Sequence, residues 1–272
     1  FEQVELMRKL EEEGDADGSY SEPLARQWIA FGKTSVTNEL PCIDMRHGMA
    51  PSIRERIAVA FVVLAEATFA GHQDYLTCAA FARNGSLLAS GGFDKTVRLW
   101  DIPSATPVGV LSGHGSTVQC VAVDSKGKLI ASAGDDLTIM LWDAETKAPI
   151  KSIAGHSRAI EGLAFSPDDQ ILASAGADGT IRLHSRAGEF LTALDANAGR
   201  LKSVVFSPNG QWIVSGGADG TVRVWDRSSG QLNSTISAHT NTVYGVAFAP
   251  DGKRFASAGF DRTIHVRSVS AG

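Results

Sequence analysis

Cysteine, net charge and long apolar runs are all scarce in this 272-residue sequence. Its three cysteines are an odd number and too few for a disulfide framework, which favours a reducing compartment. The formal net charge is −5, so the chain has no overall basic footprint for nucleic acid. No apolar run reaches the ~20 residues of a membrane-spanning helix. These absences disfavour a secreted disulfide scaffold, direct nucleic-acid binding and a membrane span.

Targeting signals are also weak. Residues 49–70 resemble a signal peptide with an internal start, because basic residues precede an apolar segment that ends in small residues. Glu66 interrupts this segment and 48 residues precede it, so we interpret it as part of the mature chain. The sequence begins with Phe1 rather than methionine, which is compatible with a fragment or a processed form.

Internal repetition is what the sequence has in abundance. The stretch 71–101 opens with Gly-His, closes with Trp-Asp and contains three apolar runs separated by two turns. The same order of features recurs four more times, with a period of 41 or 42 residues. A fixed period in this range predicts stacked repeats that bury their apolar faces against one another.

Each repeat predicts four strands. In the first repeat we expect strands at 77–81, 87–90 and 96–100, with a fourth, outermost strand at 107–111. The equivalent first strands of the later repeats are expected at 118–123, 160–165, 201–206 and 243–248. Pairs such as Asn84-Gly85 follow the first strands, and they supply the positive φ angles of tight hairpins.

The motif Gly-His … Ser-Gly-Gly-Phe-Asp-Lys-Thr-Val-Arg-Leu-Trp-Asp within 71–101 resembles the WD-repeat β-propeller family. The resemblance covers about residues 62–268 and implies four-stranded antiparallel blades arranged radially around a central channel. We therefore expect an all-β WD-repeat β-propeller with five recognisable repeats in residues 57–272. Residues 1–56 carry no copy of the repeat and are expected to form a partly helical or irregular N-terminal extension.

The sequence does not decide how the propeller closes. The last repeat ends just after its third strand, so its fourth strand would have to come from about residues 62–69. Residues 53–66 also fit a helix, and we favour a strand only for 62–69. Such an arrangement would close a ring of five, whereas the family more often has seven blades. The alternatives are an open or partial propeller, divergent blade material within 1–60, or completion by another chain.

The resemblance also implies a structural network. In this family a His, a Ser or Thr, a turn Asp and a Trp form a hydrogen-bonded chain within one blade. Carried over to this sequence, the network residues are His72, Ser90, Asp94 and Trp100; His114, Ser132, Asp136 and Trp142; His156, Ser174 and Asp178; Ser215, Asp219 and Trp225; and His239, Ser257 and Asp261. Blades three to five are expected to have incomplete networks, because His184 and Arg267 replace Trp and Asn197 replaces His.

We expect no catalytic, cofactor-binding or metal site. The His-Ser-Asp recurrence could be mistaken for a hydrolase triad, but a triad needs one nucleophile in one cleft, and five near-copies at equal spacing indicate architecture. The repeat histidines have no second histidine or cysteine two to five residues away, which argues against a metal site. His184 and His265 are interpreted as packing or surface residues. No glycine-rich phosphate loop is present, so no cofactor is predicted.

Function in the resembling family lies mainly at the rim and the channel entrance. The candidate partner-binding residues there are Tyr75, Phe93, Glu161, Arg200, Lys202, Tyr244 and Phe260. The four aromatic residues belong to the first and last repeats and would form one patch if the ring closed there. The alternative is that Phe93 and Phe260 only cap the neighbouring blade. Arg158, Arg200 and Lys202 would make a small basic spot that we interpret as solvated.

These observations predict a non-catalytic protein–protein interaction scaffold, a subunit of a larger assembly in the cytoplasm. It would bind other proteins through the propeller face and the N-terminal extension. A nuclear or organellar complex is also compatible. The alternative function is a C-terminal sensor or regulatory repeat domain of a longer enzyme or signalling protein.

Overall fold

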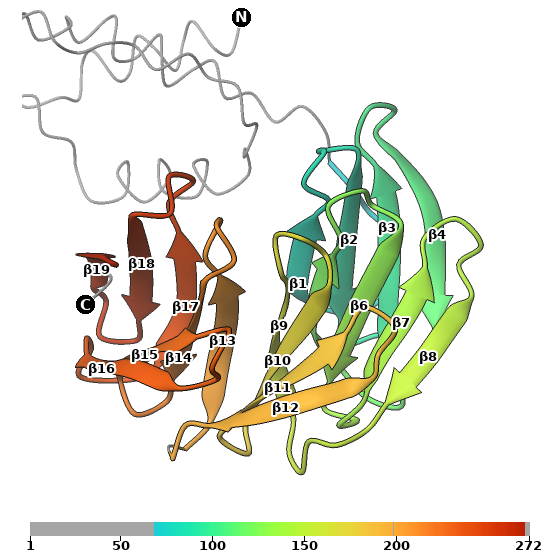
Figure 1. Cartoon of the computed structure of the whole chain (residues 1–272). Helices are drawn as coiled ribbons and strands as arrows, with labels where there is room; N and C mark the ends of the chain where they lie inside the picture. Colours follow the sequence, from blue (N-terminus) through green and yellow to red (C-terminus); the bar gives the residue numbers. More distant parts are fainter. Residues whose placement is uncertain (1–67, 198, 270–272) are drawn as a thin grey trace, which may run out of the picture. The chain divides into compact units, whose positions relative to one another are not determined.

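The computed structural model describes residues 68–197 and 199–269, and in this part of the chain it contains strands and no helix that could cross a membrane (Figure 1). The chain divides into two units, Phe1–Thr68 and Phe69–Gly272, and all described strands belong to the second. The N-terminal extension predicted for 1–56 and the helix-or-strand segment 53–66 lie outside the described residues.

The strands follow one another in five successive sheets, which we call blades one to five. Blade one contains β1 (Leu76–Phe81), β2 (Leu87–Gly92), β3 (Thr96–Asp101) and β4 (Thr106–Ser112). Blade two contains β5 (Val118–Val123), β6 (Leu129–Gly134), β7 (Ile139–Asp143) and β8 (Pro149–Ile153). Blade three contains β9 (Ile160–Phe165), β10 (Ile171–Gly176), β11 (Thr180–Ser185) and β12 (Phe190–Asp195). Blade four contains β13 (Leu201–Phe206), β14 (Trp212–Gly217), β15 (Thr221–Asp226) and β16 (Leu232–Ser237). Blade five contains β17 (Val243–Phe248), β18 (Arg254–Gly259) and β19 (Ile264–Ser268).

Each blade is an antiparallel meander in which consecutive strands pair, because the connections are short turns. The hairpins between the first and second strands turn at a residue with positive φ. That residue is Gly85, Gly127, Gly210 or Gly252, with φ between 67° and 72°, or Asp169, with φ 57°. Glycine adopts this conformation without steric cost, and Asp is among the few other residues that tolerate it. The turn residues read from the sequence therefore set the hairpins.

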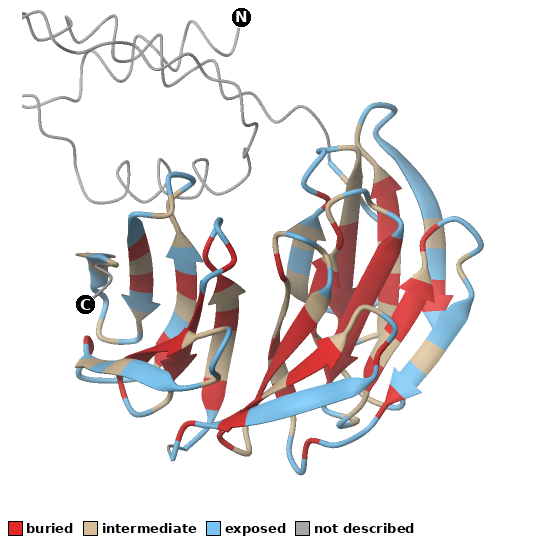
Figure 2. Cartoon of the chain, viewed as in Figure 1, coloured by how far each residue is buried: buried red, intermediate tan, exposed pale blue. Residues whose placement is uncertain are grey.

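The apolar core lies between blades rather than within any one of them. One buried cluster joins Leu99 and Leu111 of blade one to Val118 and Ile130 of blade two, and three similar clusters join the later neighbours. The second strands are the most deeply buried, whereas much of the outermost strands β4, β8, β12 and β16 is exposed (Figure 2). Each repeat thus buries its faces only by packing on its neighbours, as in other stacked repeats.

The innermost strands pack in the order β1, β5, β9, β13 and β17. Within residues 68–197 and 199–269 this series does not close by packing of β17 against β1, and blade five has three strands. The prediction of an all-β fold built from antiparallel blades is confirmed. The described residues form an open row of five blades. The strand predicted at 62–69 lies mostly outside the described residues, and its last two residues, Thr68 and Phe69, are not in a strand.

Candidate functional site

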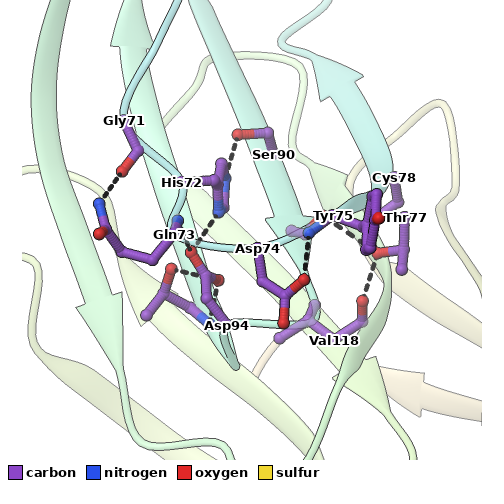
Figure 3. A network of polar contacts seen from close by, with 12 residues as sticks. Gly71, His72, Gln73, Asp74, Tyr75, Thr77, Cys78, Ser90, Asp94 and Val118 are labelled. Carbon is purple, nitrogen blue, oxygen red and sulfur yellow. Dashed lines mark hydrogen bonds and ion pairs between the residues drawn. The ribbon is translucent and has the colours of Figure 1, made fainter.

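Blade one contains a largely buried chain of four polar side chains, of which Figure 3 shows His72, Ser90 and Asp94. His72 precedes β1, and its Nδ1 and Nε2 lie 2.8 Å from Asp94 Oδ2 and 2.8 Å from Ser90 Oγ. Trp100 Nε1–H donates to the same Ser90 hydroxyl at 2.8 Å. The chain therefore ties the loop before β1 to β2, to β3 and to the turn between them.

The turn aspartate is the most heavily bonded member of this chain. Burial raises the pKa of Asp94, but hydrogen bonds from Gln73, Thr96 and His72 outweigh burial and bring the pKa to about 2. The carboxylate is charged at neutral pH, and its donors satisfy it in a partly buried place.

Blade two repeats the arrangement. His114 Nδ1 lies 2.7 Å from Asp136 Oδ2 and Nε2 lies 2.6 Å from Ser132 Oγ, to which Trp142 Nε1–H donates at 2.7 Å.

Blades three and five keep the His-Ser-Asp part and lack the tryptophan link. His156 lies 3.0 Å from Asp178 Oδ2 and 2.8 Å from Ser174 Oγ. His239 lies 2.9 Å from both Asp261 Oδ1 and Ser257 Oγ. At the tryptophan position, His184 Nδ1 and Arg267 Nε are buried without a hydrogen-bond partner.

Blade four lacks the histidine and replaces its contact with an arginine. Arg223 Nη2 lies 2.7 Å from Asp219 Oδ2, and Trp225 Nε1–H donates to Ser215 Oγ at 3.2 Å. Asn197, at the histidine position, has a positive φ of 44° and makes no contact with Asp219 among the described hydrogen bonds. In blade four the guanidinium of Arg223 therefore bonds the turn aspartate in place of a histidine.

The network serines are inaccessible. Their side chains are at most 5% exposed, and each lies between strands of its own sheet (Ser90, Ser132, Ser174, Ser215 and Ser257). A nucleophile must reach its substrate in an open cleft. In these positions the hydroxyls instead link strands, so the geometry of the networks serves the fold.

Two exposed aromatic pairs stand on the first and last blades, where Tyr75, Phe93 and Phe260 lie in loops or turns and Tyr244 lies on β17. Tyr75 and Phe93 pack edge to face with ring centroids 6.3 Å apart, and Tyr244 and Phe260 lie 6.1 Å apart. All four side chains are between 48% and 79% exposed. Among the described residues no ring contact joins one pair to the other, so the structure shows two pairs where closure of the ring would have made one patch.

Between these pairs lies an ionic cluster that spans three blades. Glu161 on β9 forms ion pairs with Arg200, just before β13, and with Lys202 on β13. Lys202 Nζ also lies 5.7 Å from the ring centroid of Tyr244 on β17, within cation–π range. Two cations of the expected basic spot, Arg200 and Lys202, therefore share the carboxylate of Glu161.

These side chains occupy equivalent turns and first-strand positions of successive blades, so they lie at the same end of the blades. We call this surface the rim face, and define it as Tyr75, Phe93, Gln119, Asp135, Glu161, Arg200, Lys202, Tyr244 and Phe260. In blade two its members are polar, and Gln119 Nε2–H donates to Asp135 Oδ2 at 3.1 Å. The rim face thus runs from an aromatic pair through polar and ionic groups to a second aromatic pair.

One cluster was not anticipated from the sequence. The ring of His265 on β19 lies 4.7 Å from the ring of His239, nearly perpendicular to it. One possible ligand atom from each of His239, Asp261 and His265 lies within 4.8 Å of the others. A signal was present, because His265 stands where three other repeats carry Arg98, Arg182 and Arg223.

Comparison with known proteins agrees with the repeat pattern. The family model described as "WD domain, G-beta repeat" matches five segments, 65–101, 105–143, 147–185, 188–226 and 230–268, which together cover more than half of the chain. The chain is 49% identical over 41 residues to the Notchless protein homolog of Arabidopsis thaliana, covering 15% of this chain and 9% of that protein. It is 51% identical over 41 residues to the Periodic tryptophan protein 2 homolog of Schizosaccharomyces pombe, covering 15% of this chain and 5% of that protein. It is 50% identical over 36 residues to human WD repeat-containing protein 18, covering 13% of this chain and 8% of that protein. The matched segments thus span less than a tenth of each relative.

Proposed function

The chain belongs to the WD-repeat family, whose repeats generally mediate protein–protein interaction, and from this premise we propose that it is a non-catalytic scaffold that binds proteins through its rim face. The observation that carries the proposal is the pair of exposed aromatic clusters, Tyr75 with Phe93 and Tyr244 with Phe260.

The aromatic side chains suit an interface because they are exposed and because the backbone of their turns is held by hydrogen bonds. Phe93 N–H donates to the carbonyl of Tyr75 at 2.9 Å, and Phe260 N–H donates to the carbonyl of Thr242 at 2.8 Å. These bonds hold each turn against the start of the first strand. Binding of a partner therefore costs little entropy in ordering the turns that carry Phe93 and Phe260.

The composition of the rim face supports the same proposal. Tyrosine and arginine are enriched among the residues that dominate binding energy at protein interfaces. Arg200 is half exposed, whereas its partner Glu161 is nearly covered, and Lys202, the other cation paired with Glu161, lies beside the Tyr244 ring. A partner that contacts Tyr244 would also meet the charged groups of Lys202 and Arg200, which are held in place by their ion pairs with Glu161.

The compartment and the assembly are part of the proposal. The cytoplasm is supported by Cys78 and Cys120, which are free thiols, as expected under reducing conditions. Membership of a larger assembly, and contact of residues 1–56 with a partner or with the propeller, stay predictions.

The test is quantitative affinity capture from cell extract with the full chain as bait. Phe93→Ala/Phe260→Ala should reduce the recovery of bound proteins several-fold. Ile150→Ala is the matched control, because this side chain is 55% exposed on the outer strand β8 and is not part of the rim face. Equal recovery by wild type and the double variant would contradict the proposal.

A further inference from the structure

We propose that blade five carries a binding site for a divalent transition metal of the Zn²⁺ class, formed by His239, Asp261 and His265. The three residues come from three separate segments: the loop before β17, the turn between β18 and β19, and β19 itself. Their possible ligand atoms lie within 4.8 Å of one another. Two imidazoles and a carboxylate are a ligand set that zinc and related metals accept.

The spacing of the donor atoms is close to what a metal requires. His239 Nδ1 lies 2.9 Å from Asp261 Oδ1. The Thr263 hydroxyl lies 3.2 Å from His239 Nδ1 and 3.1 Å from His265 Nε2, so it now bridges the two rings. Ligand atoms around a tetrahedral zinc ion, with bonds of about 2.0–2.1 Å, lie roughly 3.3 Å apart. A rotation of Thr263 and a small shift of His265 would bring the three donors to this spacing.

The missing tryptophan of blade five lets Ser257 accept a hydrogen bond from His239, which ligation of a metal through Nδ1 requires. In blades one and two a tryptophan N–H donates to the network serine, which favours a serine hydroxyl that donates to the histidine Nε2. In blade five Arg267 takes that place and no hydrogen bond to Ser257 is described from it. Without a metal, His239 Nδ1–H donates to Asp261 Oδ1 at 2.9 Å. Metal binding would select the other tautomer of the ring, in which Nδ1 has lost its proton and coordinates the metal, while Nε2–H donates to Ser257 Oγ, 2.9 Å away. Metal-bound histidines commonly donate their other N–H to an oxygen in this way.

Blade five is also the repeat in which the neighbouring side chain favours a cation. The position of His265 is occupied by arginine in blades one, three and four, and by Met140 in blade two. In blade four that arginine, Arg223, already neutralises the turn aspartate at 2.7 Å. A fixed positive charge at this position would repel a metal ion, whereas an imidazole nitrogen can coordinate it. His265 and Asp261 are partly exposed, so an ion can enter.

The test is a titration of the metal-free full chain with ZnCl₂ in competition with a chromophoric chelator, with the bound metal counted by elemental analysis. We expect one site in the wild type and a loss of at least about 100-fold in affinity in His265→Arg, since even residues that only support a ligand contribute 10–100-fold. His265→Arg restores the side chain that three other blades carry, so it should keep the fold, which circular dichroism checks. Should it not fold, His265→Gln replaces it and has the same expected loss.

His184→Phe is the matched control, because it removes a histidine of another blade and leaves the cluster intact. It should bind Zn²⁺ with wild-type affinity, and Zn²⁺ should raise the thermal midpoint of the wild type and of His184→Phe but not of His265→Arg. The proposal is overturned if the wild type binds no stoichiometric Zn²⁺, or if His265→Arg binds it as tightly as the wild type.

Discussion

Replacing His184 with tryptophan should stabilise the protein, and the gain should grow as the pH falls. His184 is 1% exposed and its Nδ1 has no hydrogen-bond partner. It pairs with Leu172 across the sheet as Trp142 pairs with Ile130 in blade two, so both side chains occupy the same place. The Trp142 ring there lies over a glycine, and blade three keeps a glycine, Gly155, at the equivalent position. Arg182 lies over Gly155 in the wild type. In blade one the equivalent Arg98 and Trp100 both lie over Gly71, so a tryptophan at 184 can fit beside Arg182 and donate its N–H to the network serine.

The expected magnitude has two parts. A new N–H···O bond in the buried network contributes about 1 kcal/mol, and removal of the unpaired Nδ1 contributes about 1 kcal/mol or more. The gain at pH 7.5 is therefore about 2 kcal/mol in the free energy of unfolding.

The second part is a proton linkage. Burial is the largest cause that lowers the pKa of His184 from 6.5 to about 4, and the nearby charges of His156, Arg182 and Lys151 contribute to the same shift. The unfolded chain takes up a proton near pH 6.5, whereas the folded chain does so only near pH 4. Between these values the unfolded state binds more protons, so acidification destabilises the wild type. At pH 5.0 the loss is about 2 kcal/mol, at 1.36 kcal/mol for each pKa unit, and tryptophan does not share it.

The assay is urea unfolding followed by far-ultraviolet circular dichroism at pH 7.5 and pH 5.0. The difference between His184→Trp and wild type should widen from about 2 to about 4 kcal/mol. The aspartates are common to both proteins and cancel in this difference. His184→Phe should show the same widening and a smaller gain at pH 7.5, since it lacks the N–H donor. A constant difference at both pH values would contradict the claim that His184 is uncharged in the folded protein. A destabilised His184→Trp would contradict the claim that blade three can accommodate a tryptophan at this position.

Three further substitutions test the networks and the packing between strands. Trp142→Phe removes the N–H bond to a serine hydroxyl 2.7 Å away and should cost about 1–2 kcal/mol in urea unfolding; an unchanged midpoint would contradict this. Gly134→Ala would drive a methyl group into the backbone carbonyl of Thr117 and should destabilise by more than about 2 kcal/mol, whereas Gly245→Ala, with nothing within 4 Å, should change stability little. Burial raises the pKa of Asp178, yet its hydrogen bonds outweigh burial and bring the pKa to about 2. The wild type should therefore lose this stabilisation as the pH falls from about 4 to 2. The free energy of unfolding of Asp178→Asn should depend less on pH in this range, and an equal dependence in both proteins would argue against a hydrogen-bonded carboxylate.

Most of the strand pattern could be predicted from the sequence, because the repeats carry alternating apolar residues and turn residues at a fixed period. The first strand of blade two, for example, was predicted and found at Val118–Val123. The second strand of blade one was expected to end at Ser90 and runs on to Gly92. The reason is packing between blades: a side chain at Gly91 would collide with Val118 of blade two, so glycine here admits a neighbour instead of ending the strand.

Side-chain contacts between different repeats could not be predicted from the sequence pattern. The sequence predicted that Glu161, Arg200 and Lys202 share one face, but it did not predict that they form ion pairs. Glu161 lies in a different repeat and reaches the two cations because β9 packs against β13. His265 was interpreted as an isolated strand residue, since its neighbour His239 is far away along the chain. Its proximity depends on the pairing of β18 with β19, in which Ser257 lies opposite His265. Local spacing rules find ligands on one element and miss those that a sheet brings together.

The turn aspartate is the constant requirement of each blade, and its partner is interchangeable. Asp94 and Asp261 are bonded by histidines, whereas Asp219 is bonded by Arg223 in a blade that has no histidine at that position. A buried carboxylate is tolerated when donors satisfy it, whichever side chain supplies them. Departures from the repeat pattern therefore need not weaken a blade. They become informative where they leave a group without a partner, as His184 Nδ1 is, or where they add a donor beside a satisfied pair, as His265 does.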